Sequence, residues 1–284
     1  MAFQTIISVE HLAKYLSSSD WLVFDTRFNL MNAQWGREQY HFGHIPGASY
    51  VHLNEELSGP VIPDVTGRHP LPIFENFADR VAQWGISRQH QIVIYDQCEG
   101  MFAARMWWML KWCGLDNVAV LDGGLKAWLA AGHDVSTAPP LPSKATSLAL
   151  QANEAMYVDA QAVLESVSSR RCILMDARAT DRYRGENETI DKKAGHIPGA
   201  VSSPFMHNLD EAGCFLSVET LRDYYQPLLP QSKACNVIVY CGSGVTAAHN
   251  ILTMYHAGLG LAKLYPGSWS EWITDAKRPI ALDE

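Results

Sequence analysis

The chain has 284 residues, of which 48% are apolar and 18% charged, and its formal net charge is −8. This length is sufficient for two domains, each with its own core. The negative charge and the lack of any Lys/Arg run argue against a nucleic acid or an anionic membrane as partner. Without a basic leader or an apolar run long enough to cross a membrane, a cytoplasmic protein is expected.

Short apolar runs rich in β-branched residues alternate along the chain with helical patterns. This alternation predicts an α/β fold with mostly parallel strands flanked by helices. The expected strands are Trp21–Phe24, Gln91–Tyr95, Val118–Leu121, Ile173–Met175 and Val237–Tyr240.

A segment rich in proline and small polar residues divides the chain. Residues 138–151 contain three prolines and several small polar residues, which is typical of a linker. We therefore expect one domain over residues 1–137 and a second over residues 152–284.

The two halves share motifs in the same order, which indicates an internal duplication. Gly-His-Ile-Pro-Gly-Ala occurs at residues 43–48 and 195–200, and an Asp-x-Arg motif precedes each copy, at 25–27 and 176–178. Groups present in both copies are best explained as holding the common fold together. Groups present in only one copy are candidates for chemistry.

Cys241 follows an expected strand and begins the segment Cys-Gly-Ser-Gly-Val-Thr, after which a helical pattern starts. The glycines allow backbone N–H groups to turn toward the sulfur, and the first helical turn adds further donors. Such a cradle favours a thiolate and an anion bound beside it. A small cysteine packed at a strand end is the ordinary alternative, but the glycines and hydroxyls after Cys241 favour a reactive thiol.

The first half has Asp96 at the position of Cys241, so it cannot perform the same nucleophilic reaction. Its following segment, residues 97–102, lacks the Gly-x-Gly spacing, and no anion cradle is expected there. Cys98 lies beside Glu99 and is interpreted as an ordinary thiol.

Arg182 and Arg184 occur only in the half that contains Cys241, opposite Met31 and Ala33 of the first half. A guanidinium suits a carboxylate or a sulfonate-like anion. Arginines in loops more often face water, so the residues alone leave a substrate role open.

No metal or cofactor is expected. The six cysteines form no Cys-x-x-Cys pair and no Cys/His cluster with metal spacing, and the chain has no His-Glu-x-x-His motif or phosphate-binding loop. Reduced thiols are the default. The cysteines are Cys98, Cys113, Cys172, Cys214, Cys235 and Cys241.

The duplicated motifs, the Asp96/Cys241 difference and the ending Gly-Ser-Trp-Ser-Glu-Trp at residues 267–272 resemble the tandem-domain rhodanese-like sulfurtransferases. The resemblance covers essentially the whole chain and implies two rhodanese-like domains, of which the second is catalytic. The Cys241 loop is similar to that of 3-mercaptopyruvate sulfurtransferases, whereas thiosulfate-preferring rhodaneses commonly carry cations after the cysteine.

The resemblance implies sulfur transfer through a persulfide on Cys241. 3-Mercaptopyruvate would donate the sulfur and release pyruvate, and cyanide, a small thiol or thioredoxin would accept it. Ser243 would help to deliver a proton to the departing carbanion. The N–H groups that would hold the outer sulfur include those of Gly242, Gly244, Val245 and Thr246.

The resemblance also implies a role for Arg182, which matches an arginine that holds the substrate carboxylate. A second family arginine has no clean counterpart in the chain. Arg184, Lys192 and Lys193 are the candidates to replace it.

His69 matches a family histidine that works with the loop serine, here Ser243; the alternative is that it caps a surface turn before Pro70. Asn54 stands where the family has an acid, so a Ser-His-acid relay is either incomplete or uses Glu55.

Three other functions need to be compared with this one. Thiosulfate:cyanide sulfur transfer and a non-catalytic persulfide carrier both remain open. A phosphatase of the same fold would need the pattern Cys-x5-Arg, and residue 247 is Ala, which argues against that activity.

Overall fold

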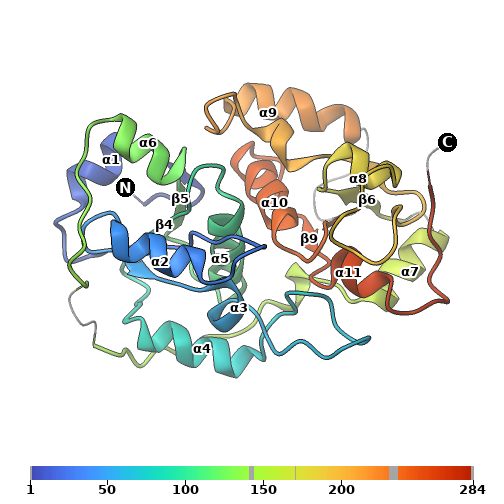
Figure 1. Cartoon of the computed structure of the whole chain (residues 1–284), viewed down its shortest axis with the longest axis horizontal. Coiled ribbons are helices and arrows are strands. Elements are labelled where there is room, and N and C mark those ends of the chain that lie inside the picture. The colour runs from blue at the N-terminus through green and yellow to red at the C-terminus, as the bar shows by residue number, and fades with distance from the viewer. Residues whose placement is uncertain (1, 141–143, 170, 230–235, 283–284) are drawn as a thin grey trace. The chain divides into compact units, whose positions relative to one another are not determined.

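The computed structural model describes residues 2–140, 144–169, 171–229 and 236–282. The chain forms two compact units, each built around its own sheet (Figure 1). The first unit comprises Met1–Gly59, Leu71–Asn153 and Glu211–Phe215. The second comprises Pro60–Pro70, Glu154–Asp210 and Leu216–Glu284.

These units differ from two contiguous domains over residues 1–137 and 152–284. Pro60–Pro70 packs with the second unit and Glu211–Phe215 with the first, so two short segments are exchanged. The described part of the expected linker, 138–151, contains no helix or strand, and residues 141–143 lie outside the described residues. Local sequence patterns do not reveal such an exchange because it depends on contacts between distant residues.

The sheet of the first unit has the order β1-β5-β4-β2-β3, and all of its paired strands are parallel. Every residue of the central strand β4 is buried, as expected where helices cover both faces of a sheet. The strands are β1 Ile6–Ile7, β2 Trp21–Asp25, β3 Ser49–Tyr50, β4 Gln91–Tyr95 and β5 Val118–Leu121.

Helices cover both faces of this sheet. Helix α5 packs against β4 and β5, while α1 and α6 contribute to a separate cluster that includes Val93 and Tyr95 of β4. The helices are α1 Val9–Tyr15, α2 Trp35–Phe42, α3 Leu53–Glu56, α4 Phe74–Gln83, α5 Met101–Trp112 and α6 Gly124–Ala130.

The sheet of the second unit has the order β7-β6-β8-β9 and is also parallel. Tyr157 forms a parallel bridge with Leu264 of β9, at the place that β1 takes beside β5 in the first unit. The two units therefore share one strand order. The strands are β6 Ile173–Asp176, β7 Val201–Ser202, β8 Val237–Tyr240 and β9 Lys263–Leu264.

Helix α10 packs on β8 and β9, and residues of α7 and α11 join a core cluster that includes Ile238 and Tyr240 of β8. The α-helices of this unit are α7 Ala160–Ser169, α8 Thr180–Arg184, α9 Val218–Tyr225, α10 Thr246–His256 and α11 Ser268–Trp272. The 3-10 helices are η1 Glu154–Met156, η2 Phe205–Asn208 and η3 Gln226–Leu228.

The duplicated polar residues hold the fold in both units, as predicted. Arg178 Nη2 donates to Asp176 at 2.6 Å and to the carbonyl of Gly195 at 2.7 Å. The corresponding arginine of the first unit makes the same two contacts. His196 Nδ1 lies 2.9 Å from the carbonyl of Tyr183, and its counterpart again does the same. A histidine used in this way is not available as a general base.

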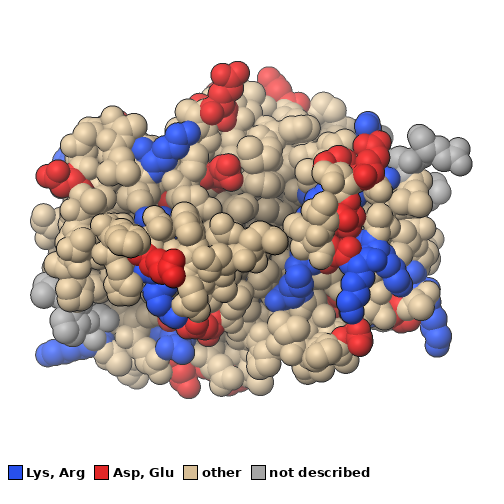
Figure 2. All heavy atoms as spheres, viewed as in Figure 1, with Lys and Arg blue, Asp and Glu red and all other residues tan. Residues whose placement is uncertain are grey.

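No helix in the described ranges combines the length and the apolar character needed to cross a membrane. On the face shown in Figure 2, basic side chains are interspersed with acidic ones and much of the surface is uncharged.

Candidate active site

Cys241 lies directly after the carboxyl end of β8, the strand between β6 and β9, and five residues before α10 begins. Ligands of parallel α/β sheets bind at this edge. The Cys241 side chain is 2% exposed, and residues 242–245 are buried with it. The structure thus places the predicted nucleophile at the edge of the sheet where the fold supports chemistry.

The loop after Cys241 turns back on the sulfur. Gly244 has φ +78°, in the left-handed region that favours glycine, and its N–H donates to Cys241 Sγ at 3.2 Å. Among the hydrogen bonds of the described residues, this one joins a donor expected from residues 242–246 to the sulfur. Val245 is buried before Thr246 starts the helix.

A second segment fixes the backbone of the nucleophile. Ser268 Oγ accepts from the N–H of Cys241 at 3.1 Å and donates to the carbonyl of Tyr265 at 2.9 Å. Ser268 has φ +54°, a conformation that a non-glycine residue adopts at an energetic cost. The backbone N–H of Trp269 donates to the Cys241 carbonyl at 2.9 Å. The start of α11 therefore holds the loop in place.

The matching loop of the first unit corrects the prediction that no cradle forms there. The Asp96 carboxylate accepts from the N–H groups of Cys98, Gly100 and Phe102 at 3.1, 2.9 and 2.9 Å. Gly100 supplies the left-handed turn, with φ +76°. The first unit does build an N–H cradle, but its own buried carboxylate fills it.

His69 and Ser243 are in contact. The Nδ1 atom of His69 lies 2.7 Å from Ser243 Oγ, and both residues are 5% exposed. His69 reaches the loop because Pro60–Pro70 packs with the second unit. A histidine that only caps a surface turn would not be buried, so that alternative is wrong.

Glu55, the acid expected if the relay is complete, is engaged inside the first unit. Arg37 Nη2 donates to the Glu55 carboxylate at 2.6 Å. Asn54 lies in the short helix α3 of the same unit. Completion of a Ser-His-acid relay by Glu55 stays a prediction.

Arg182 is held by two buried carboxylates. Its Nε and Nη2 atoms donate to Glu188 at 2.9 to 3.2 Å, and Nη2 also donates to Asp191 at 3.0 Å. The side chains of Glu188 and Asp191 are 2% and 4% exposed. Glu188 also accepts from Arg178 at 3.3 Å. The carboxylates fix the direction of the Arg182 guanidinium beside the loop.

Arg68 joins this cluster, which the sequence did not indicate. Its Nη1 atom donates to Asp191, and its backbone N–H donates to Ser270 Oγ at 3.1 Å. A Cβ atom added to Gly242 would lie 2.7 Å from Arg68 Nη2 and 3.7 Å from both terminal nitrogens of Arg182. Both guanidinium groups thus lie over the residue that follows the nucleophile.

The candidates for a second cation lie elsewhere. Arg184 ends helix α8 with an exposed side chain, and Lys192 is exposed with Nζ 3.6 Å from Asp64. Lys193 is also exposed. Within the described residues, no hydrogen bond or ion pair joins these three side chains to the Cys241 loop. The side chain that lies over Gly242 together with Arg182 is that of Arg68.

Sequence patterns could have given a weak signal for Arg68, because it directly precedes His69. Asp191 and Glu188 lie in the segment that also contains Lys192 and Lys193, and acidic residues are not the expected ligands of an anionic donor. The sequence did not predict the contact of Ser268 with the Cys241 backbone, because this contact depends on the backbone conformation of Ser268.

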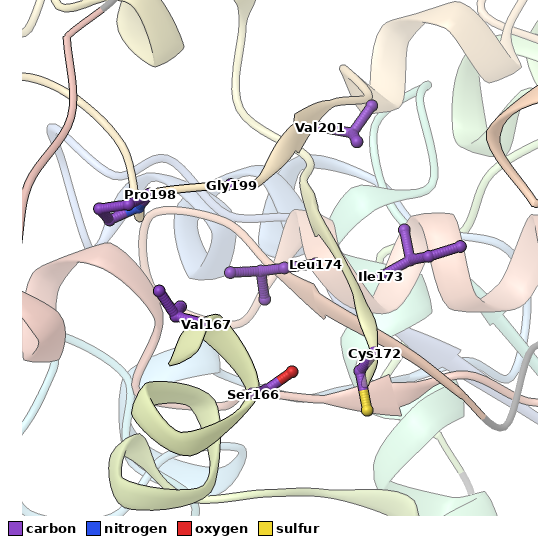
Figure 3. A pocket seen from close by; sticks show the side chains of 8 residues that line it. All are labelled: Ser166, Val167, Cys172, Ile173, Leu174, Pro198, Gly199 and Val201. Carbon is purple, nitrogen blue, oxygen red and sulfur yellow. The ribbon is translucent and has the colours of Figure 1, made fainter. Parts of the chain in front are cut away.

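A cavity of about 480 Å³ lies at the other edge of the same sheet (Figure 3). It opens beside Ile173 and Val201, the first residues of the parallel strands β6 and β7, together with Cys172. Cys241 follows the carboxyl end of β8. The cavity lies at the amino ends of the strands and therefore does not include the nucleophile.

The other described cysteines have different surroundings, and none of those described forms a disulfide bond. Burial raises the pKa of Cys113 to about 12, which makes this thiol a poor nucleophile. Cys98 lies in the first unit, where its Sγ donates to the carbonyl of Ala212 at 3.5 Å. Cys235 lies outside the described residues.

Comparison with known proteins relates this fold and loop to sulfur transfer. A family model of the rhodanese-like domain matches residues 8–131 and 159–275. The chain is 43% identical over 285 residues to a probable 3-mercaptopyruvate sulfurtransferase of Pseudomonas aeruginosa, covering 100% of both proteins. It is 33% identical over 285 residues to the thiosulfate sulfurtransferase of Rattus norvegicus, covering 96% of this chain and 93% of the rat protein. The solved 3-mercaptopyruvate sulfurtransferase of Leishmania major matches with a TM-score of 0.87 and 30% identity, covering 98% of this chain and 76% of that one.

Proposed function

Because the chain belongs to the rhodanese-like domain family and is a sulfurtransferase, we propose that it moves sulfur from 3-mercaptopyruvate to a thiophilic acceptor through a persulfide on Cys241. The contact between His69 and Ser243 beside the nucleophile is the observation that carries this choice of donor. Two similar proteins support it, since the one from Pseudomonas aeruginosa is named a probable 3-mercaptopyruvate sulfurtransferase and the one from Leishmania major a 3-mercaptopyruvate sulfurtransferase.

In the first step the Cys241 thiolate attacks the sulfur of 3-mercaptopyruvate. A sulfur–sulfur bond forms, the carbon–sulfur bond of the donor breaks, and its electron pair moves to carbon as the enolate of pyruvate. The N–H of Gly244, at 3.2 Å from Sγ, is placed to stabilise negative charge on sulfur in both the thiolate and the persulfide.

The enolate needs a proton before pyruvate leaves. Ser243 Oγ can deliver it and be reprotonated from His69, since the two groups already share a hydrogen bond at 2.7 Å. Thiosulfate releases sulfite instead, which is a stable anion and needs no proton. The Ser243–His69 pair is therefore useful for mercaptopyruvate in a way that it is not for thiosulfate.

In the second step an acceptor attacks the outer sulfur of the persulfide. The sulfur–sulfur bond breaks, its electrons return to Cys241 as the thiolate, and the acceptor leaves carrying the sulfur. The acceptor has to be a nucleophile toward sulfur, such as cyanide or a small thiol. Thioredoxin would act in the same way through its thiol. A cytoplasmic location remains an expectation from the sequence.

Steady-state kinetics with cyanide as acceptor test this function. The proposal expects kcat/KM for 3-mercaptopyruvate to exceed that for thiosulfate by orders of magnitude, no turnover by Cys241→Ser, and normal turnover by the control Cys98→Ser. A clear preference for thiosulfate would overturn the choice of donor. Absence of turnover on either free donor would instead favour a persulfide carrier.

Thiosulfate is the second candidate donor, and one observation favours it. No cation lies within the loop sequence, but the guanidinium groups of Arg68 and Arg182 lie over Gly242 from outside. Two cations at this point also suit the oxygens of thiosulfate. The kinetic comparison of 3-mercaptopyruvate with thiosulfate distinguishes these two functions.

A further inference from the structure

The cavity at the amino ends of β6 and β7 has the size and lining of a site for a small molecule (Figure 3). Its volume is about 480 Å³, and pockets that bind small molecules measure about 300–1,000 Å³. Such pockets are mostly apolar, with few polar groups that orient the ligand. The apolar side chains of this lining are those of Val167, Ile173, Leu174, Pro198 and Val201.

Ser166 supplies a buried polar group in this lining. The residue is 8% exposed, and the described residues give its hydroxyl no hydrogen-bond partner. In Figure 3 the Ser166 side chain points from α7 toward the side of the cavity on which Cys172 lies. A buried hydroxyl without a partner is destabilising, and a ligand that forms a hydrogen bond with it removes that penalty.

The internal duplication shows which side chains stand at this place in the first unit. Counted back from the duplicated Asp-x-Arg motif, Cys172 is the counterpart of Trp21. By the same count, Ser166 is the counterpart of Tyr15. Each pair joins a residue of the helix before the strand to a residue at the start of that strand. Two aromatic residues of the first unit are thus replaced by two short ones in the second.

The two aromatic residues form a stacked pair in the first unit. The rings of Tyr15 and Trp21 have centroids 4.9 Å apart and an interplanar angle of 14°. Trp21 also packs against the core cluster that includes Val93 of β4. Since Ser166 and Cys172 both line the cavity, larger side chains at their positions would project into it. The cavity therefore lies where the other copy of the fold holds planar rings.

We propose that this cavity binds a small planar aromatic compound that carries an N–H or O–H donor, of which indole is an example. The ring would lie against the apolar lining, which is stabilised when water is excluded from it. The ligand's donor would bond to Ser166 Oγ, and the Cys172 sulfur would contact the ring. The site lies at the other end of the strands from Cys241, so it goes beyond sulfur transfer and does not depend on the donor.

Protection of Cys172 from alkylation tests this site, because the thiol lines the cavity. Cys172 is partly exposed, so we expect iodoacetamide to reach it in the protein without ligand. With indole at ten times its dissociation constant, alkylation of Cys172 should be about tenfold slower. Peptide mapping separates this residue from Cys98, a partly exposed thiol of the first unit whose alkylation rate should not change.

Filling the cavity gives a second test that does not depend on the thiol. Indole should raise the temperature of thermal unfolding of the wild type, because a ligand of the folded state stabilises it. Ser166→Tyr combined with Cys172→Trp copies the aromatic pair of the first unit and should abolish this effect. Ser166→Tyr alone serves if the double variant folds poorly. Ser168→Tyr, at an exposed position of the same helix, is the control and should keep the effect.

The proposal expects protection of Cys172 that saturates with indole and is absent at Cys98. An unchanged alkylation rate of Cys172 up to the solubility limit of indole would overturn it. Equal slowing at both thiols would also overturn it, because indole would then act without a site. Equal protection by cyclohexanol, which is apolar but not planar, would overturn the assignment of an aromatic ligand.

Discussion

The Nδ1 atom of His69 lies 2.7 Å from the Oγ atom of Ser243, although the two residues are 174 positions apart. This contact exists because the segment Pro60–Pro70 packs with the second unit, while the residues on either side of it belong to the first. The exchanged segment also carries Arg68. The side chains of His69 and Arg68 therefore both reach the Cys241 loop through one feature of the fold.

We expect His69→Gln to lower kcat for 3-mercaptopyruvate by on the order of 100-fold, the usual scale of general acid catalysis. The same variant should change turnover of thiosulfate far less, because sulfite leaves without a proton. Parallel kinetics with both donors check this, and Ser243→Ala should behave in the same way. Equal losses for both donors would show that the pair supports the loop and does not deliver a proton.

Gly242→Ala should weaken donor binding with little effect on folding. The added Cβ would lie 2.7 Å from Arg68 Nη2, the end of a flexible side chain that can move away. We therefore expect KM for 3-mercaptopyruvate to rise about tenfold or more, as for a lost charge-assisted hydrogen bond. Thermal unfolding should be nearly unchanged. An unaltered KM would mean that the donor does not use the space beside Gly242.

Gly244→Ala should lower stability and kcat, whereas Gly242→Ala should mainly raise KM. The two variants therefore form a matched comparison. Gly244 has φ +78°, where an alanine is strained, so we expect a loss of about 1 to 2 kcal/mol in the free energy of unfolding. Its N–H also donates to Cys241 Sγ, so kcat should fall more than KM rises. Urea unfolding and steady-state kinetics measure the two effects, and a normal kcat would contradict this role of the N–H.

Glu271→Gln should stabilise the protein more at higher pH. Burial raises the pKa of Glu271 above 4.5, and Arg278 opposes this only in part. A carboxyl with a raised pKa favours the folded state below its unfolded value, and this contribution is lost as pH rises through the folded value. A glutamine at this position does not titrate, so its contribution to the free energy of unfolding does not fall as pH rises. Urea unfolding measured from below pH 4.5 upward should show that the free energy of unfolding of the variant rises relative to that of the wild type. Glu186→Gln, at an exposed position, is the control.

Asp96→Asn should destabilise the first unit without changing the chemistry. The Asp96 carboxylate accepts four backbone N–H groups, and an amide would present its own donors to some of them. We expect a loss of roughly 2 kcal/mol or more in unfolding free energy. The value of kcat/KM per folded molecule should stay at the wild-type level. A large fall in kcat/KM would mean that this loop acts on the reaction.

The five strands expected from apolar runs are present, as is the fold that they imply. The two-residue strands, such as β7, were not predicted because two residues give no periodic pattern. The exchange of Pro60–Pro70 and Glu211–Phe215 was also missed, since it follows from contacts across the chain and not from local composition.

Site residues could be predicted where they lie in one continuous motif or where the comparison of the two duplicated halves distinguishes them. Cys241 and Ser243 lie in one continuous motif, and Arg182 lacks a counterpart in the first half. Arg68 gave only the weak signal of its position before His69, and Asp191 gave none, because the contacts of both residues with each other and with Gly242 depend on the fold. Arg184 could not be excluded from the sequence, since exposure at the end of α8 is a property of the fold.

The most direct test of the central claim is mass spectrometry of the protein after incubation with 3-mercaptopyruvate and without an acceptor. The account predicts one added sulfur atom on the peptide that contains Cys241, its loss on addition of cyanide, and no such species in Cys241→Ser. Sulfur found on another cysteine, or turnover without any sulfur on Cys241, would contradict the account.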